Sequence, residues 1–190
     1  MSSKRCIAIA TIAGAVVALI FVVTSRRDEE PSLAREELTR AELDLRDDVL
    51  YKKGSEKPFG GTLVEHYPEM KLKLAIEIRD GKPNGLSRGY YEDGKQEVEE
   101  HFEAGISNGT RIRWYQNGEK KSEAQIVDGK IEGTFTRWHD NGQKAAEAQM
   151  VAGEPHGLSQ GWHRSGARKS RVELEHGNVV SKQFWDDGDA

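Results

Sequence analysis

Cysteine is almost absent from the chain: Cys6 is the single cysteine among 190 residues. One thiol cannot close an intramolecular disulfide, and it cannot supply the several thiolates that zinc fingers and iron–sulfur clusters need. The His, Asp and Glu residues do not show the spacing of a metal-ligand set either. We therefore expect no metal ion and no other cofactor.

An excess of positive charge is also absent, because 28 Lys and Arg residues stand against 32 Asp and Glu residues, for a net charge of −4. Nucleic-acid-binding domains usually carry a basic footprint, so we expect no nucleic-acid partner.

Proline is rare, with five residues, which argues against a Pro/Gly-rich disordered chain. Hydrophobic residues form only 36% of the chain, a small supply for a globular core. Glycine is the exception, since its 20 residues exceed the usual share of about 7%.

Long hydrophobic runs are limited to one uncharged segment of 20 residues at positions 6–25. As a helix this segment would span about 30 Å, the thickness of the hydrocarbon core of a bilayer. We predict a transmembrane helix of the signal-anchor type within residues 1–25. A cleaved signal peptide is the alternative, with Val23 and Ser25 at the −3 and −1 positions of a cleavage site. The apolar stretch exceeds the about 7–15 residues of a usual signal peptide, which favours the anchor.

Both alternatives place the rest of the chain outside the cytoplasm. Lys4 and Arg5 before the segment favour a cytoplasmic N-terminus, whereas Arg26 and Arg27 after it act in the opposite direction. We expect a single-pass membrane protein whose remaining residues are periplasmic or on the cell surface. The protein would be secreted if the N-terminal segment is cleaved.

A short acidic stretch at residues 26–49 follows the hydrophobic run. Its apolar residues Leu33, Leu38, Ala41 and Leu45 recur at roughly helical intervals. Ser32 stands where a helix N-cap would be. We predict a juxtamembrane helix over about 33–45 that acts as a spacer. A covering helix such as this one is one way to bury the apolar face of the sheet predicted for the rest of the chain; the others are neighbouring repeats, curvature or a second chain.

Glycine recurs with a period of 24 residues after position 60. Fourteen of the twenty glycines fall into three registers of this period, which is the mark of a repeat architecture. We divide residues 50–190 into repeats near 61–84, 85–108, 109–132, 133–156 and 157–180, with a partial copy at 181–190. The three registers are Gly61, Gly85, Gly109, Gly133 and Gly157; Gly94, Gly118, Gly142 and Gly166; and Gly81, Gly105, Gly129, Gly153 and Gly177.

Bulky residues follow the same period at three positions of the repeat. The first holds an aromatic residue, the second a tyrosine or histidine, and the third an apolar residue. Evenly spaced aromatic residues of this kind are typical of packing ladders rather than of ligand platforms. The rows are Tyr90, Trp114, Trp138 and Trp162; Tyr67, Tyr91, Tyr115, His139 and His163; and Ile78, Phe102, Ile126, Met150 and Leu174.

Each repeat contains two arms, of about six and eight residues, between glycine turns. These lengths suit strands and are too short for stable isolated helices. Tripeptides such as Gln116-Asn117-Gly118 fit a type I turn followed by a left-handed glycine. We predict an all-β repeat fold, an elongated single-layer antiparallel sheet of tandem β-hairpins. Its structural turn glycines are Gly81, Gly94, Gly105, Gly118, Gly129, Gly142, Gly153, Gly166 and Gly177.

Alternation along the arms predicts which residues share a face of this sheet. Counted through the turn at Gly118, this alternation predicts one apolar and one polar face, with Arg111 opposite Glu123 as a charge pair. The predicted apolar face carries Ile112, Trp114, Ser122, Ala124 and Ile126. The predicted polar face carries Arg111, Arg113, Tyr115, Lys121, Glu123 and Gln125.

The repeat unit G-x-x-x-x-[WY]-[YH]-x-[DN]-G-x-[KR], followed by an apolar residue and another glycine, resembles the MORN repeat. It is most similar to the bacterial variant often labelled as the YwqK-type antitoxin family. The resemblance extends from Tyr51 to about Gly177, and the sequence departs from it at Met70 and Ser165. It implies an interaction module associated with membranes, scaffolds or partner proteins.

No catalytic set accompanies the repeat. The pattern G-x-S-x-G occurs around Ser87 and Ser159, but a hydrolase nucleophile needs a helix directly after the serine, and none is expected here. We predict a non-catalytic, membrane-tethered module for protein binding or scaffolding. Its partner is an unidentified protein, it contacts the membrane through residues 6–25, and homo-oligomerisation is possible. An antitoxin that neutralises a toxin by direct binding is the alternative. The candidate binding residues are Tyr91, Arg111, Arg113, Tyr115, Arg137, His139 and His163.

Overall fold

The computed structural model describes residues 36–175 and 177–188. The predicted transmembrane helix at 6–25 lies outside these residues. Within the described part of the chain, no helix has the length and apolar character needed to cross a membrane.

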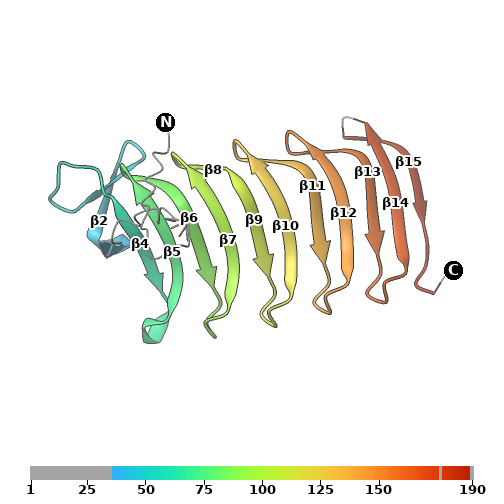
Figure 1. Ribbon diagram of the computed structural model, residues 1–190, viewed down its shortest axis with the longest axis horizontal. Coiled ribbons are helices and arrows are strands. Elements are labelled where there is room, and N and C mark those ends of the chain that lie inside the picture. The colour runs from blue at the N-terminus through green and yellow to red at the C-terminus, as the bar shows by residue number, and fades with distance from the viewer. Residues whose placement is uncertain (1–35, 176, 189–190) are drawn as a thin grey trace, which may run out of the picture. The chain divides into compact units, whose positions relative to one another are not determined.

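One open sheet of 13 strands dominates the described residues (Figure 1). Its strands follow the chain order from β4 to β15, each antiparallel to its neighbours, so the predicted sheet of tandem hairpins is confirmed. The strands are β4 (Gly61–His66), β5 (Leu72–Arg79), β6 (Lys82–Tyr90), β7 (Gln96–Glu103), β8 (Ile106–Ser107), β9 (Gly109–Trp114), β10 (Lys120–Val127), β11 (Lys130–Trp138), β12 (Lys144–Val151), β13 (Glu154–Trp162), β14 (Arg168–Glu175) and β15 (Asn178–Phe184). A 3₁₀ turn η2 (Pro68–Met70) joins β4 to β5.

Two kinds of turn alternate along the sheet. At one end of the strands, Gly118 has a φ of 93° and its N–H donates to the carbonyl of Tyr115 at 2.9 Å. At the other end, two-residue turns such as Asp128-Gly129 have positive φ at both residues, 49° and 78°, as type I′ hairpins require. The positive φ explains why glycine recurs in these turns.

A β-bulge recurs in each repeat hairpin that closes at the Gly118 end of the strands, and it corrects the predicted faces. In the pair β9–β10, Trp114 lies opposite Lys120 and Arg113 opposite Ser122, so Lys121 is an extra residue. Bulges recur with the 24-residue period, at residues 73, 97, 145 and 169. Each extra residue shifts the in–out alternation of side chains on one arm by one position. Counting along the arms without the bulge therefore assigns the side chains of one arm to the wrong face of the sheet.

The sheet therefore has two faces that differ from the prediction. The face with Ile78, Phe102, Ile126, Met150 and Leu174, here the Ile126 face, also carries the arginines Arg111, Arg113 and Arg137. The other face, here the Trp face, carries Tyr90, Trp114, Trp138 and Trp162. The predicted pair of Arg111 with Glu123 is wrong, because Arg111 lies opposite Ala124 and Glu123 lies opposite Ile112.

The predicted juxtamembrane helix over 33–45 is wrong for its described residues. These form β1 (Glu37–Thr39), the 3₁₀ turn η1 (Arg40–Glu42) and β2 (Leu43–Arg46), and β2 pairs with β3 (Val49–Lys52) in a separate hairpin. β1 adds to the edge of the sheet parallel to β4, and the N–H of Thr62 donates to the carbonyl of Glu36 at 2.8 Å. Pairing with the sheet overrides the weak helical spacing of this segment.

The largest group of buried apolar residues lies at this N-terminal end of the sheet. Residues from β1 to β3 and Phe59 cover the Ile126 face over β4 and β5. The segment thus packs on part of the sheet with strands and a 3₁₀ turn, where the sequence predicted a helix. The group consists of Leu38, Leu43, Leu50, Phe59, Leu63 and Ile78, all at most 9% exposed.

Candidate functional site

The row of tyrosines and histidines ties each repeat to the next. The hydroxyl of Tyr91 donates to the carbonyl of Trp114 at 2.7 Å, and that of Tyr115 donates to the carbonyl of Trp138 at 2.9 Å. The same contact recurs with Nε2 of His139 on the carbonyl of Trp162, at 3.0 Å. Because a carbonyl only accepts, Nε2 of His139 carries the proton. Tyr67 and His163 repeat the contact at either end of the row.

Four of the predicted binding residues therefore have a structural role. The polar atoms of Tyr91, Tyr115, His139 and His163 are bonded to the backbone of the following repeat, and their side chains are partly buried. They lie at the ends of the strands, where Tyr91 also lines a pocket together with Arg113.

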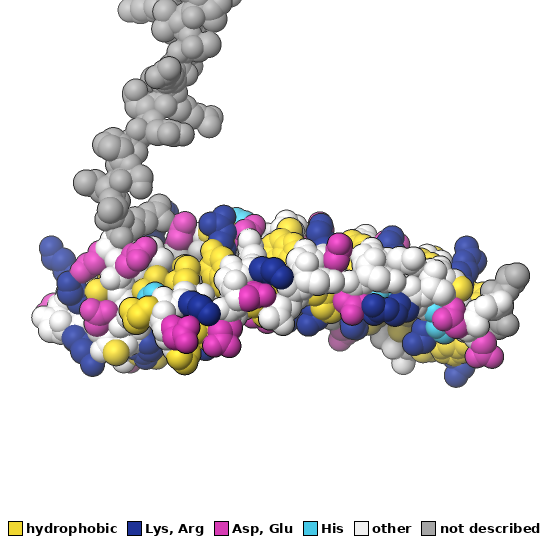
Figure 2. All heavy atoms as spheres, turned by 90° about the horizontal axis from the view of Figure 1, so that it is seen from below, with side chains coloured by type: hydrophobic (Ala, Val, Ile, Leu, Met, Phe, Trp, Pro, Cys, Tyr) yellow, Lys and Arg dark blue, Asp and Glu magenta, His cyan; other side chains and the backbone are white. Residues whose placement is uncertain are grey.

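The turns beside this row are also tied to one another. The side-chain amide of Asn117 donates to the carbonyl of Asp140 at 2.6 Å, and that of Asn141 donates to the carbonyl of Arg164 at 2.9 Å. Arg164 in turn forms an ion pair with Asp140. Figure 2, which looks onto this end of the strands, shows acidic and basic side chains interspersed along it. This edge presents no field of a single sign.

On the Trp face, lysine side chains of the chain itself lie over two of the tryptophan rings. The Nζ of Lys120 lies 5.3 Å from the centre of the Trp138 ring and 2.7 Å from Oε2 of Glu123. Lys144 repeats the arrangement with the Trp162 ring at 5.4 Å and with Glu147 at 2.7 Å. These cation–π contacts and ion pairs occupy the ring faces that a sugar or peptide would need.

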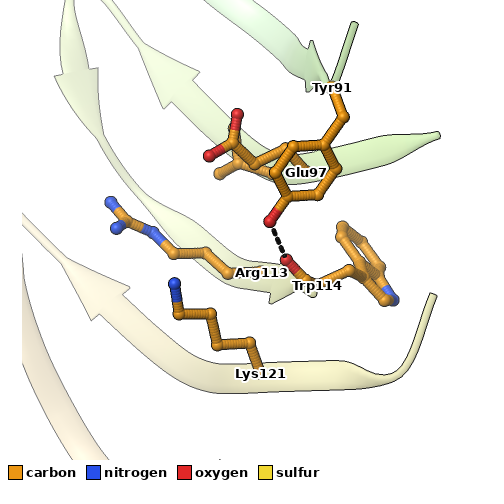
Figure 3. A pocket seen from close by; sticks show the side chains of 6 residues that line it. Tyr91, Glu97, Arg113, Trp114 and Lys121 are labelled. Atoms are coloured by element: carbon orange, nitrogen blue, oxygen red, sulfur yellow. Dashed lines mark hydrogen bonds between the residues drawn. The ribbon is translucent and has the colours of Figure 1, made fainter. Parts of the chain in front are cut away.

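A shallow pocket of about 180 Å³ lies between the second and third hairpins of the array (Figure 3). Its volume is below the about 300–1,000 Å³ of typical small-molecule sites. Burial raises the pKa of the Tyr91 hydroxyl beside it, and the charges of Glu97 and Asp93 add to this effect. The lining residues are Tyr91, Glu97, Val98, Arg113, Trp114 and Lys121.

Arg111 has its partner within the sheet. Its guanidinium forms an ion pair with Glu100, and the hydroxyl of Ser107 donates to the same carboxylate. The Arg111 and Glu100 side chains are 28% and 15% exposed, and Nε of Arg111 is buried without a hydrogen-bond partner. Pairing satisfies most of this charge, so Arg111 is a component of the sheet rather than a free binding group.

Arg113 and Arg137 are the two predicted binding residues that remain available. Both are exposed, and both lie directly opposite Ser122 on the Ile126 face. Within the described part of the chain, neither forms an ion pair or a side-chain hydrogen bond. Lys121, the bulge residue beside Ser122, belongs to the same group but was not among the predicted site residues. Only the bulge brings Lys121 beside the arginines, and counting residues along the strand does not reveal it.

The serines of the two G-x-S-x-G patterns lie inside strands. Ser87 is 7% exposed in β6, opposite Ile76 and Glu100, and Ser159 occupies the matching position in β13. Neither serine is followed by a helix, so the strand–turn–helix elbow of a hydrolase is missing at both. Across residues 36–175 and 177–188, no group of three or more His, Cys, Asp or Glu residues is arranged to hold a metal ion.

Comparison with known proteins supports the repeat assignment. The family model of the MORN repeat variant matches residues 83–104 and 131–152. The two matches begin two 24-residue periods apart and cover the hairpins β6–β7 and β11–β12. The hairpin β9–β10 between them has the same bulge and the same turn. No curated protein matches the chain.

Proposed function

We propose that the chain is a non-catalytic repeat module that binds a protein partner or organises a scaffold. The observation that carries this proposal is the pair of exposed arginines on the Ile126 face, Arg113 and Arg137, which lack ion-pair and side-chain hydrogen-bond partners within the described residues although Ala124 and Ile126 on the same face are buried. MORN repeats commonly mediate binding or scaffolding, which supports the same function. The repeats supply a long surface on which side chains can vary while the hairpins persist.

The membrane tether is part of the proposal. The uncharged segment at 6–25 is long enough to span a bilayer as a helix. In this arrangement the repeat sheet stands outside the cytoplasm, in the periplasm or on the cell surface, and captures its partner close to the membrane. Protease treatment of spheroplasts, in which the outer side of the cytoplasmic membrane is accessible, tests this arrangement, because a sheet outside the cytoplasm is digested and a cytoplasmic one is protected.

Site-specific crosslinking in native membranes tests the binding function. A photoreactive residue in place of Ser122 lies between the two exposed arginines, and one in place of Gln149 lies on the Trp face as the matched control. We expect a discrete crosslinked adduct from position 122 and none from position 149. An adduct of about twice the chain mass identifies a second copy as the partner. The absence of an adduct at both positions contradicts the proposed function.

The antitoxin role is the alternative form of the same binding function. It follows from the resemblance of the repeat to the YwqK-type antitoxin family. In this case the crosslinked partner is a toxin encoded beside the gene, and deletion of the gene stops growth unless the toxin is also deleted. A partner that leaves growth unaffected in the deletion strain contradicts the antitoxin role and leaves the scaffold role in place.

A further inference from the structure

Three cations gather at the middle of the Ile126 face. Arg113 in β9 and Arg137 in β11 both lie directly opposite Ser122 in β10, so all three residues share one face. Two strand spacings separate the arginine Cα atoms by about 10 Å. Figure 3 shows Arg113 and Lys121 extending to the same side of the strands, while the Trp114 ring extends away from them. We call Arg113, Lys121 and Arg137 the cation cluster.

The cation cluster differs from most other charges near it because it has no acidic partner. Arg88 pairs with Glu99 at 3.1 Å, Lys120 with Glu123 at 2.7 Å, and Arg111 with Glu100. Within the described residues, the cluster forms no ion pair or side-chain hydrogen bond. The Lys121 ammonium makes a cation–π contact with the Tyr115 ring, at 5.4 Å from its centre. Three like charges close together without partners repel one another, and an anionic partner removes that cost.

The repeat fold does not require these cations. The positions equivalent to Arg113 and Arg137 in the flanking repeats are Gly89 and Gly161, both buried. A Cβ at Gly89 would lie 2.8 Å from Val98, and one at Gly161 would lie 2.6 Å from Ser170. The two central repeats therefore carry an exposed charge where the flanking repeats carry a buried glycine, and no ion pair or hydrogen bond of the described residues accounts for these charges.

We propose that the cation cluster binds an acidic peptide segment of a partner protein. This inference rests on the proposed binding function and names the chemistry of the partner. A single carboxylate carries one negative charge, so it would neutralise only one of the three cations. A segment with several carboxylates along its length supplies one anion to each cation.

A membrane surface fits this cluster less well than an acidic peptide. Lipid-headgroup recognition usually involves clusters of about four to eight basic residues, whereas this cluster has three and Glu97 lies beside it. The net charge of −4 also opposes the approach of the chain to an anionic bilayer. Binding to anionic vesicles is therefore measured as the alternative to peptide binding in the experiment below.

Fluorescence anisotropy with a labelled octaglutamate peptide tests the proposal on the full chain in neutral detergent. The cluster variant R113Q/K121Q/R137Q removes the three cations, and the control variant K130Q/R171Q/K182Q removes three exposed cations elsewhere on the sheet. We expect the control to bind like the wild type and the cluster variant to bind about tenfold more weakly, since each exposed pair contributes up to a factor of about five. Circular dichroism establishes that both variants keep the sheet.

Two outcomes overturn the proposal: equal binding by the cluster variant and the control, or no saturable binding of the peptide to the wild type. Cluster-dependent binding to vesicles containing 20% phosphatidylserine, without peptide binding, assigns the cluster to membranes and also overturns it. The crosslinking experiment keeps the two proposals apart. If the adduct from position 122 persists when the cluster substitutions are added, the acidic-peptide proposal fails and the binding function stands.

Discussion

The two ends of the sheet bury their apolar residues to very different extents. At the N-terminal end, Phe59 and its neighbours in β1 to β5 form a core in which Phe59 is 4% exposed. At the C-terminal end, every residue of β15 is exposed, and Phe184 reaches 64%. The repeat supplies strands at both ends, and at the N-terminal end the non-repetitive residues 37–59 add further apolar side chains to the buried group. Hydrogen bonds between neighbouring repeats therefore carry more of the stability of the uncovered part.

The largest expected effect comes from truncating the covered end. Phe59→Ala removes a buried aromatic side chain and should lower the free energy of unfolding by about 3–5 kcal/mol. Phe184→Ala at the uncovered end is the control and should change it by less than about 0.5 kcal/mol. Urea unfolding followed by tryptophan fluorescence measures both. Equal losses from the two substitutions would show that the ends do not differ in burial.

Two glycines with similar left-handed backbone angles allow the cost of a steric clash with residues 49–50 to be measured apart from the cost of backbone strain. Gly118→Val should cost about 1–2 kcal/mol, because its φ of 93° disfavours a side chain although nothing lies within 4 Å of a new Cβ. Gly81→Val should cost more, because a Cβ there would lie 2.3 Å from Val49 and 2.7 Å from the Leu50 carbonyl. The difference in Tm between the two variants measures the contribution of the cover. A Gly118→Val variant with the parental Tm would contradict the hairpin assignment.

A smaller effect is expected from the tyrosine row. Tyr115→Phe removes the hydroxyl that donates to the Trp138 carbonyl and should cost about 1 kcal/mol. Amide hydrogen exchange should accelerate in β9 to β12, where neighbouring repeats are the main support. Tyr67→Phe removes the matching bond to the Tyr90 carbonyl beside the covered end and should accelerate exchange less. Equal acceleration at the two sites would show that the cover does not stabilise its neighbouring hairpins.

The smallest expected effect is a dependence on pH. A hydrogen bond from Arg88 holds the pKa of Glu99 below its usual value. Because the folded pKa lies below the unfolded pKa of about 4.3, this contribution is present at neutral pH and is lost as pH falls through the folded value. Both side chains are partly exposed, so the contribution is small. Arg88→Gln should flatten the fall in Tm between pH 5 and pH 3, and an unchanged profile would contradict the assignment.

The repeat and its turns were predictable because each depends on nearby residues. Glycine at φ values such as that of Gly118 is a local requirement of the backbone, so the 24-residue period locates the hairpins without knowledge of their neighbours. The row of apolar residues from Ile78 to Leu174 lies on one face because every repeat has the same length and the same turns. The predicted candidate site fared differently. Its tyrosines and histidines bond to the next repeat, and Arg111 pairs with Glu100. Of the seven predicted residues, Arg113 and Arg137 are therefore the two that are exposed and form no ion pair or side-chain hydrogen bond with the described residues.

The tertiary structure decided what depends on pairing between strands. One extra residue per hairpin, Lys121 in β10, reverses the alternation on one arm, and its presence is visible only when both strands are paired. The same holds for residues 37–46, where pairing of β1 with β4 and of β2 with β3 outweighs a helical spacing of leucines. The positions of the turns follow from local backbone geometry, so the sequence alone determines them. The face on which a side chain lies, the groups it pairs with and the segments that bury it depend on contacts between distant segments, so only the tertiary structure determines them.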